Sequence, residues 1–276
     1  MVLQDVSRGH GQGQVIAALR RPALSAATWA YARIRSGESP RPGLRILTYH
    51  AVGTPIEGDV RHLYNMPPAR FETHMRYLAQ NHAGRLVSLG TLPPSDGTLK
   101  IAVTFDDGYR DNLLIAAPLM AKLGIPFTVF ACTGAVAGRR AGFLGPEEVR
   151  ELAGVPGAAI GSHTVGHPRL AECGESTVNT ELADSKAYLE DLLGTRVDSI
   201  AFPHGSVNRR VRDLAESAGY RTAVSTRFDI NRPGRDPLLL CRTDIWSEDD
   251  IAVFDQKLRG DWDWNRWRSR DPQACA

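Results

Sequence analysis

The groups best suited to chemistry in this sequence are two adjacent aspartates and two closely spaced histidines. Asp106 and Asp107 follow the apolar residues 101–103, where a strand is expected to end and a glycine-containing turn to begin. Adjacent carboxylates repel each other, so a buried pair requires a cation or a shared proton. Together with His163 and His167, they form a sufficient set for a catalytic divalent metal with its own general base.

The two aspartates are expected to have different roles. A carboxylate that binds the metal loses basicity, whereas the other stays free to take a proton from water. Neighbouring side chains at a strand end point in different directions, which fits this division, but the residues alone leave open which aspartate does which. His163 and His167 are spaced as on one helix face, yet Gly166 and Pro168 favour a loop or a single turn.

Short apolar runs from residue 44 onward predict the strands that position these groups. They are rich in Val, Ile and Phe and mostly lack polar alternation, as expected of parallel strands buried on both faces. The runs are 44–49, 101–105, 126–131, 158–161, 199–202 and 221–225, with 238–241 as a seventh. Helical patterns fill the gaps, including one over 113–123, and several stop at a glycine. This alternation predicts a parallel α/β fold, either an open sheet or a barrel.

Polar side chains follow four of the predicted strands at the point where each strand ends. They are Tyr49-His50, Asp106-Asp107, His163 and Pro203-His204. In an open parallel sheet and in a barrel alike, ligands bind at the carboxyl ends of the strands. The sequence therefore predicts one site at this rim.

The two clusters also resemble known motifs. Residues 104–109 are similar to the first motif of the NodB-homology polysaccharide deacetylases (family 4 carbohydrate esterases), and residues 162–168 to the second. The resemblance implies a distorted (β/α)7 barrel. It further implies Asp106 as the general base and Asp107, His163 and His167 as ligands of a divalent metal, usually Zn²⁺, with Co²⁺, Ni²⁺ or Fe²⁺ as alternatives.

The third motif departs from the family pattern. Pro203, His204 and Gly205 resemble the segment that borders the substrate groove, and Tyr109 is a further candidate for the sugar site, with packing as the alternative. Ala201 stands where the family usually has an arginine that holds the catalytic base. We expect Arg242 to replace it through a bidentate contact with Asp106, with a plain surface arginine as the alternative.

The family's late histidine, commonly the general acid, is missing, because no histidine occurs after His204. His50 is the preferred substitute, since it ends a strand on the same rim. The alternatives are His204 as the acid and a structural role for His50.

These observations predict a metal-dependent hydrolase that removes N-acetyl groups from the amino sugars of a polysaccharide or glycan precursor. The nearest alternative is a deacylase of another amide or ester. A second is a catalytically inactive carbohydrate-binding barrel, which the absent arginine and late histidine favour, although such a protein has no use for a free base beside the metal. A third, an Asp-nucleophile phosphatase, has no use for His163 and His167.

Composition limits the partners and the organisation of the chain. Of 276 residues, 42% are hydrophobic and 23% charged, and a net charge of +2 is too small to predict a nucleic-acid partner. We expect an N-terminal extension over 1–43, helical or flexible, a deacetylase domain over 44–260, and a C-terminal tail over 261–276. No apolar stretch is long enough to span a bilayer, and the four cysteines form no CxxC pair. A cytoplasmic protein is therefore expected, with peripheral membrane contact through residues 22–34 as an alternative.

Overall fold

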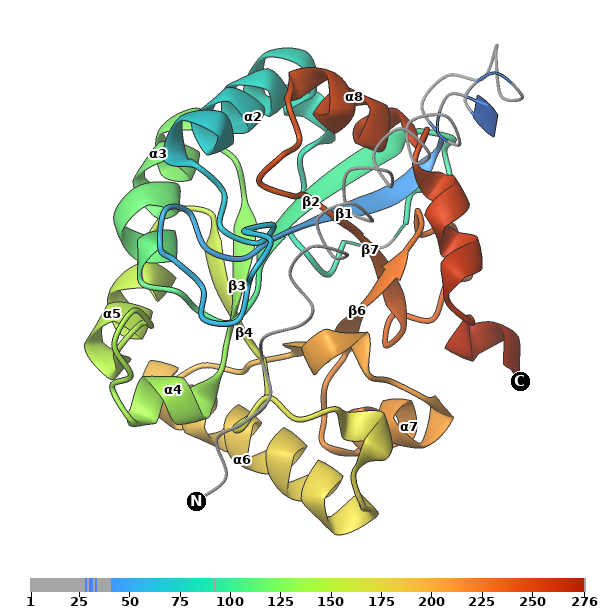
Figure 1. The fold of residues 1–276 in the computed structure, drawn as a ribbon. Coiled ribbons are helices and arrows are strands. Elements are labelled where there is room, and N and C mark those ends of the chain that lie inside the picture. Colours follow the sequence, from blue (N-terminus) through green and yellow to red (C-terminus); the bar gives the residue numbers. More distant parts are fainter. Residues whose placement is uncertain (1–27, 29, 32, 34–40, 92, 276) are drawn as a thin grey trace, which may run out of the picture.

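Seven parallel strands close into a barrel in the computed structural model of the protein (Figure 1). The structure describes residues 28, 30, 31, 33, 41–91 and 93–275. The strands are β1 (Gly43–Tyr49), β2 (Leu99–Phe105), β3 (Phe127–Ala131), β4 (Ala158–Ser162), β5 (Ser199–Ala201), β6 (Thr222–Phe228) and β7 (Leu240–Asp244). The predicted (β/α)7 barrel is confirmed. Most of the predicted extension 1–43 lies outside the described residues.

The barrel is distorted where its strands pair over short stretches. β4 and β5 are joined only through Ser162 and Ile200, and the register of β6 on β7 shifts between Val224 and Phe228. β1 and β7 close the ring through two residue pairs, one of which places Thr48 opposite Asp244. This closure brings the ends of the first and last strands to the same part of the rim.

The strand residues divide between the inside and the outside of the barrel. All seven residues of β1 are buried. Ile46 belongs to a small cluster with Phe130 and Val224, whereas the adjacent Leu47 belongs to the larger cluster that packs beneath the helices. Burial on both faces explains the continuous apolar runs in the sequence.

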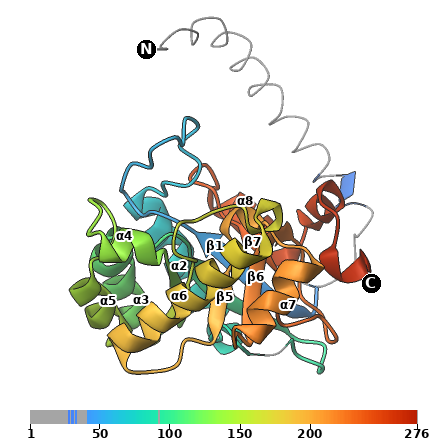
Figure 2. The ribbon, with the colours of Figure 1, turned by 90° about the horizontal axis from the view of Figure 1, so that it is seen from below.

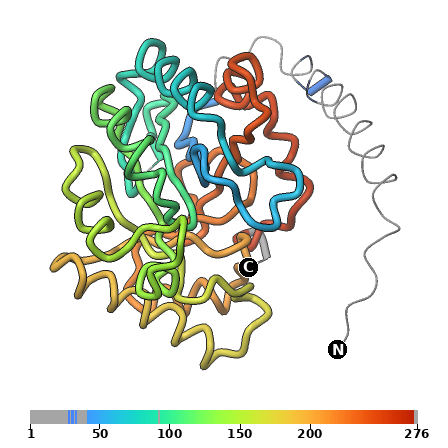
Figure 3. Tube along the Cα trace, turned by 60° about the vertical axis from the view of Figure 1, so that its left-hand side comes forward, coloured from blue at the N-terminus to red at the C-terminus, as the bar shows by residue number. Residues whose placement is uncertain are grey.

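Helices surround the barrel on the outside, as Figures 2 and 3 show from two further directions. They are α2 (Pro68–Asn81), α3 (Ala117–Leu123), α4 (Thr133–Ala137), α5 (Pro146–Ala153), α6 (Glu175–Leu193), α7 (Arg209–Ser217) and α8 (Ile251–Arg259). The predicted stops after α3, α6 and α8 are confirmed, because Gly124, Gly194 and Gly260 adopt left-handed φ angles of 65°, 66° and 88°. None of the described helices combines the length and apolar character needed to span a bilayer.

Two elements differ from the sequence prediction. The helix expected over 113–123 begins as a π-helical turn (Asn112–Ala116) and becomes α-helical only at Ala117. Pro118 explains this, because proline lacks an N–H and its ring clashes with the carbonyl four residues earlier in a regular helix. The seventh strand runs from Leu240 to Asp244 instead of 238–241, because Asp236 turns the chain by accepting the backbone N–H of Leu238.

The segment after α8 folds back onto the outside of the barrel and buries a carboxylate against β1. Asp263, in the 3₁₀ turn η5 (Asp263–Arg268), is fully buried and accepts both guanidinium arms of Arg45 from β1, at 3.0 and 3.1 Å. Arg45 also donates to the carbonyl of Leu258. Nearby, the Trp264 indole donates to the Thr28 hydroxyl, so described residues near both ends of the chain pack together.

We expect Asp263→Ala to lower the free energy of unfolding by about 3–5 kcal/mol, because it leaves the Arg45 charge buried without a counter-charge. Chemical denaturation measures the change. Asp184→Ala, on the exposed face of α6, is the matched control and should stay within about 0.5 kcal/mol of wild type. Equal effects of the two substitutions would contradict a structural role for the ion pair.

Candidate metal and acid–base site

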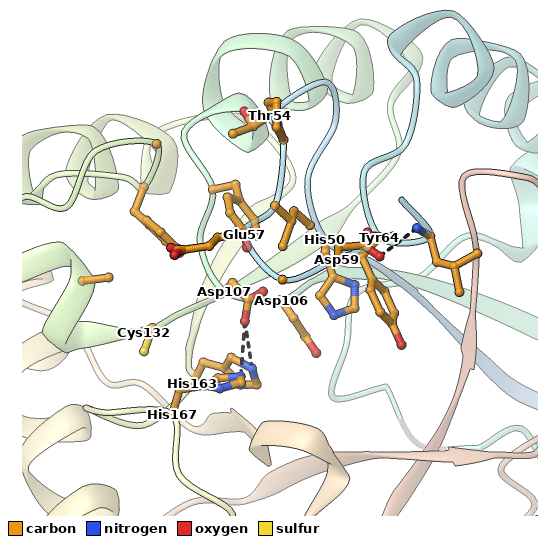
Figure 4. Close-up of a pocket in the computed structure, with 18 of the residues that line it drawn as sticks. His50, Thr54, Glu57, Asp59, Tyr64, Asp106, Asp107, Cys132, His163 and His167 are labelled. Carbon is orange, nitrogen blue, oxygen red and sulfur yellow. Dashed lines mark hydrogen bonds and ion pairs between the residues drawn. The ribbon is translucent and has the colours of Figure 1, made fainter. Parts of the chain in front are cut away.

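One carboxylate and two imidazoles converge at the rim of the barrel. The Asp107 Oδ1 lies 3.4 Å from Nε2 of His163 and 3.4 Å from Nε2 of His167, as the dashed lines in Figure 4 mark. One ligand atom from each of the three residues lies within 4.8 Å of the others. This is the size and the donor chemistry of a divalent metal site with three protein ligands.

The surroundings of the two imidazoles fit metal binding. His163 is buried, and its Nδ1 lies 2.8 Å from the backbone carbonyl of Ala201. Because a carbonyl only accepts, Nδ1 carries the hydrogen, and Nε2, which lies toward Asp107, is the nitrogen that could bind a cation. Burial and the neighbouring His163 lower the pKa of His167 to about 4, which keeps that ring neutral and able to bind a cation.

The backbone around these ligands adopts conformations that are rare outside glycine. Asp107, Thr164 and His167 have φ angles of 71°, 66° and 60°. The loop between the histidines is tied down, because the Thr164 hydroxyl accepts the His167 N–H, and Glu181 of α6 accepts the N–H groups of Val165 and Gly166. The loop expected between His163 and His167 is therefore present, and it is held rigidly.

The other aspartate, Asp106, forms an ion pair with an arginine. Both carboxylate oxygens of Asp106 accept from the Arg242 guanidinium at 2.6 Å, and both side chains are buried. Arg242 also donates its Nε to the carbonyl of Ser225. Burial raises the pKa of Asp106, but the positive charge of Arg242 and the nearby imidazoles outweigh it and hold the pKa below its ordinary value. Asp106 is thus an ionised, fixed carboxylate beside the cluster.

A groove of about 1070 Å³ opens over this site. The site residues predicted from the sequence that line this groove are His50, Asp106, Asp107, Tyr109, His163, His167 and His204. Pro203 and Gly205 lie behind its wall. Pro203 is buried, and a Cβ on Gly205 would lie 2.1 Å from the Thr226 hydroxyl, so only glycine fits there. Tyr109 is stacked on Phe143 at 4.8 Å, which gives the groove an aromatic wall.

The candidate acid, His50, is half-buried and lines the same groove. Its backbone carbonyl accepts from the side-chain amide of Asn112 at 2.9 Å. Figure 4 shows its imidazole beside the ring of Tyr64, with Asp106 nearby. His50 therefore faces the same groove as the candidate metal and base residues.

Among the groove residues that sequence reasoning missed are Tyr64 and Asp244, the two that lie next to His50. Asp244 was overlooked because the seventh strand was expected to end at 241, three residues before the aspartate that ends it. Burial raises the pKa of Asp244, and Arg242 and His50 offset only part of that rise. Tyr64 lies in an irregular loop, where no periodicity indicates which way a side chain points.

Comparisons with known proteins agree with this arrangement. The family model described as polysaccharide deacetylase matches residues 95–223. YxkH of Bacillus subtilis (strain 168), assigned to the polysaccharide deacetylases, is 29% identical over 194 residues, which cover 66% of this chain. The same stretch spans only 64% of YxkH, less than two thirds of that relative's length.

Solved structures show the same likeness. The Streptococcus pyogenes deacetylase PplD in complex with acetate is 25% identical and has a TM-score of 0.68, covering 79% of this chain and 99% of that one. The polysaccharide deacetylase BC0361 from Bacillus cereus is 25% identical with a TM-score of 0.67, covering 79% of this chain and 69% of that one.

We expect the purified protein to bind about one equivalent of a divalent metal, and Asp107→Ala or His167→Ala to abolish stoichiometric binding, because three ligands are the minimum for a tight site. Metal content after dialysis and isothermal titration calorimetry measure this. His82→Ala removes a half-buried histidine outside the groove and should retain the metal. Unchanged metal content in the Asp107 and His167 variants would place the binding site elsewhere.

Proposed function

We propose that this chain, which belongs to the polysaccharide deacetylase family, removes N-acetyl groups from the amino sugars of a polysaccharide or glycan precursor. The observation that carries the proposal is the separation of the two aspartates, with Asp107 facing two imidazoles and Asp106 facing a guanidinium. A ligand and a base side by side are what hydrolysis by an activated water requires.

Asp107, His163 and His167 hold the divalent cation in this proposal, and zinc is the cation that one carboxylate and two imidazoles suit best. When bound, the cation acidifies a coordinated water and polarises the acetamide carbonyl. The hydrogen bond from His163 Nδ1 to the Ala201 carbonyl keeps the ligating nitrogen aimed at the site.

Asp106 acts as the general base that takes a proton from the attacking water. Arg242 keeps this carboxylate ionised and fixes its direction through two hydrogen bonds. The bidentate contact supplies from β7 the support that an arginine at position 201 would supply from β5.

His50 donates the proton that the leaving amine needs when the C–N bond breaks, so that acetate and a free amino sugar result. Asp244 lies close to His50, and the imidazole offsets part of the rise that burial causes in the pKa of the Asp244 carboxyl. Tyr109 and His204 form the walls against which the sugar ring binds, and the turn at Pro203 and Gly205 carries His204.

Acetate release from N-acetylglucosamine oligomers tests the function. We expect release by wild type, loss on adding a chelator, and a decrease of about 10²–10⁴-fold in Asp106→Asn, because the amide cannot accept the proton. Asp184→Asn is the matched control.

Two outcomes would contradict the proposal. If wild type and Asp106→Asn bind the glycan equally and neither releases acetate with any divalent metal, the protein is a carbohydrate-binding barrel. If phosphate instead of acetate is released from a phosphorylated substrate, the chemistry is that of a phosphatase.

The role of His50 has a separate signature. We expect His50→Ala to lower N-deacetylation by about 10²-fold or more and to leave hydrolysis of an aryl acetate nearly unchanged, because a phenolate leaves without a proton whereas an amine does not. Steady-state kinetics on both substrates measures the difference. Equal losses on both substrates would assign His50 a structural role.

A further inference from the structure

The imidazole of His50 is held in an unusual way. Among the residues that the structure describes, no hydrogen bond to either ring nitrogen of His50 is present; only its backbone carbonyl accepts one. The χ2 torsion of histidine has broad minima, so packing must set the direction of the ring. Its packing partner is Tyr64, whose ring centroid lies 4.7 Å away at an interplanar angle of 53° (Figure 4).

Tyr64 is itself fixed by the construction of its loop. Both oxygens of the Asp59 carboxylate accept backbone N–H groups, Oδ1 from Leu63 at 3.1 Å and Oδ2 from Tyr64 at 2.8 Å. The carbonyl of Tyr64 accepts the N–H of Ala51, the residue that follows His50. The loop therefore brings its aromatic ring back against the strand end that carries His50.

Asp244 completes the surroundings of the two rings. The pairing of Thr48 with Asp244 across β1 and β7 places this carboxylate near His50. Burial, together with the negative charges of Asp244 and Asp59, raises the pKa of Tyr64, so its hydroxyl stays protonated. The imidazole thus lies against an aromatic ring that limits its rotation and close to a carboxyl group.

We propose that Tyr64 is a positioning residue for the proton donor: its ring, carried on the turn that Asp59 stabilises through backbone N–H groups, aims the His50 imidazole at the nitrogen of the leaving amine. This inference rests on the proposed function. Because it concerns only proton delivery, it predicts a defect confined to substrates whose leaving group needs a proton. A ring that merely stacks on the sugar or stabilises the fold predicts a different pattern.

The experiment compares N-deacetylation of an N-acetylglucosamine oligomer with hydrolysis of an aryl acetate. We expect Tyr64→Ala to lower kcat for the oligomer by about 10²-fold, since a displacement near 1 Å of a catalytic group has an effect of that size. The aryl acetate should be hydrolysed at close to the wild-type rate. Tyr64→Phe, which keeps the ring, should restore N-deacetylation, and Asp59→Ala, which releases the turn, should share the defect of Tyr64→Ala.

Control variants distinguish a failure of the inference about Tyr64 from a failure of the proposed function. Tyr188→Ala removes a ring of equal size from α6, remote from the groove, and should affect neither reaction. Asp106→Asn should lower both reactions, because the attacking water needs its base in each. If wild type releases no acetate from the oligomer, the proposed function fails and not this inference alone.

With an active wild type, three results would overturn the inference. Equal losses on both substrates in Tyr64→Ala would mean a structural role. A raised KM for the oligomer with unchanged kcat would mean that the ring binds sugar. A defect in Tyr64→Phe as large as that in Tyr64→Ala would mean that the hydroxyl, and not the ring, takes part in proton transfer.

Discussion

The contact between Arg242 and Asp106 is the interaction on which the arrangement of the site depends. Two adjacent carboxylates at the end of β2 would repel each other and resist burial. The guanidinium neutralises Asp106 from inside the barrel, which leaves Asp107 to turn toward the two histidines with a φ angle of 71°. One buried ion pair thus separates a carboxylate that can bind a cation from one that can accept a proton.

This ion pair also shows that a closed parallel barrel can supply the same side-chain contact from a different strand. At position 201, where the resemblance leads one to expect an arginine, the chain has an alanine whose carbonyl accepts from His163 instead. Every strand delivers its carboxyl end to the same rim, so a guanidinium from β7 reaches Asp106 as well as one from β5 would. For a contact with Asp106, the position of the arginine along the chain matters less than its position on the rim of the barrel.

Much of this could be predicted from the sequence because the signals are local. Runs such as 44–49 and 101–105 are mostly apolar and buried on both faces, and the glycines that stop α3, α6 and α8 mark their ends directly. Asp244 and Tyr64 could not be predicted in the same way. The first depends on a turn made by Asp236, and the second on a loop whose shape is set by the two acceptor oxygens of Asp59. Both depend on contacts between residues that no periodic pattern connects.

Thr164, between the two histidines, combines a strained backbone with a hydroxyl group that the loop uses. A β-branched residue in the left-handed region is strained by about 1–2 kcal/mol, and a chain under selection for stability alone would carry glycine there. Glycine, however, lacks the hydroxyl that accepts the N–H of His167. A substitution that relieves the backbone strain at Thr164 would therefore also remove the hydrogen bond that holds His167 in place.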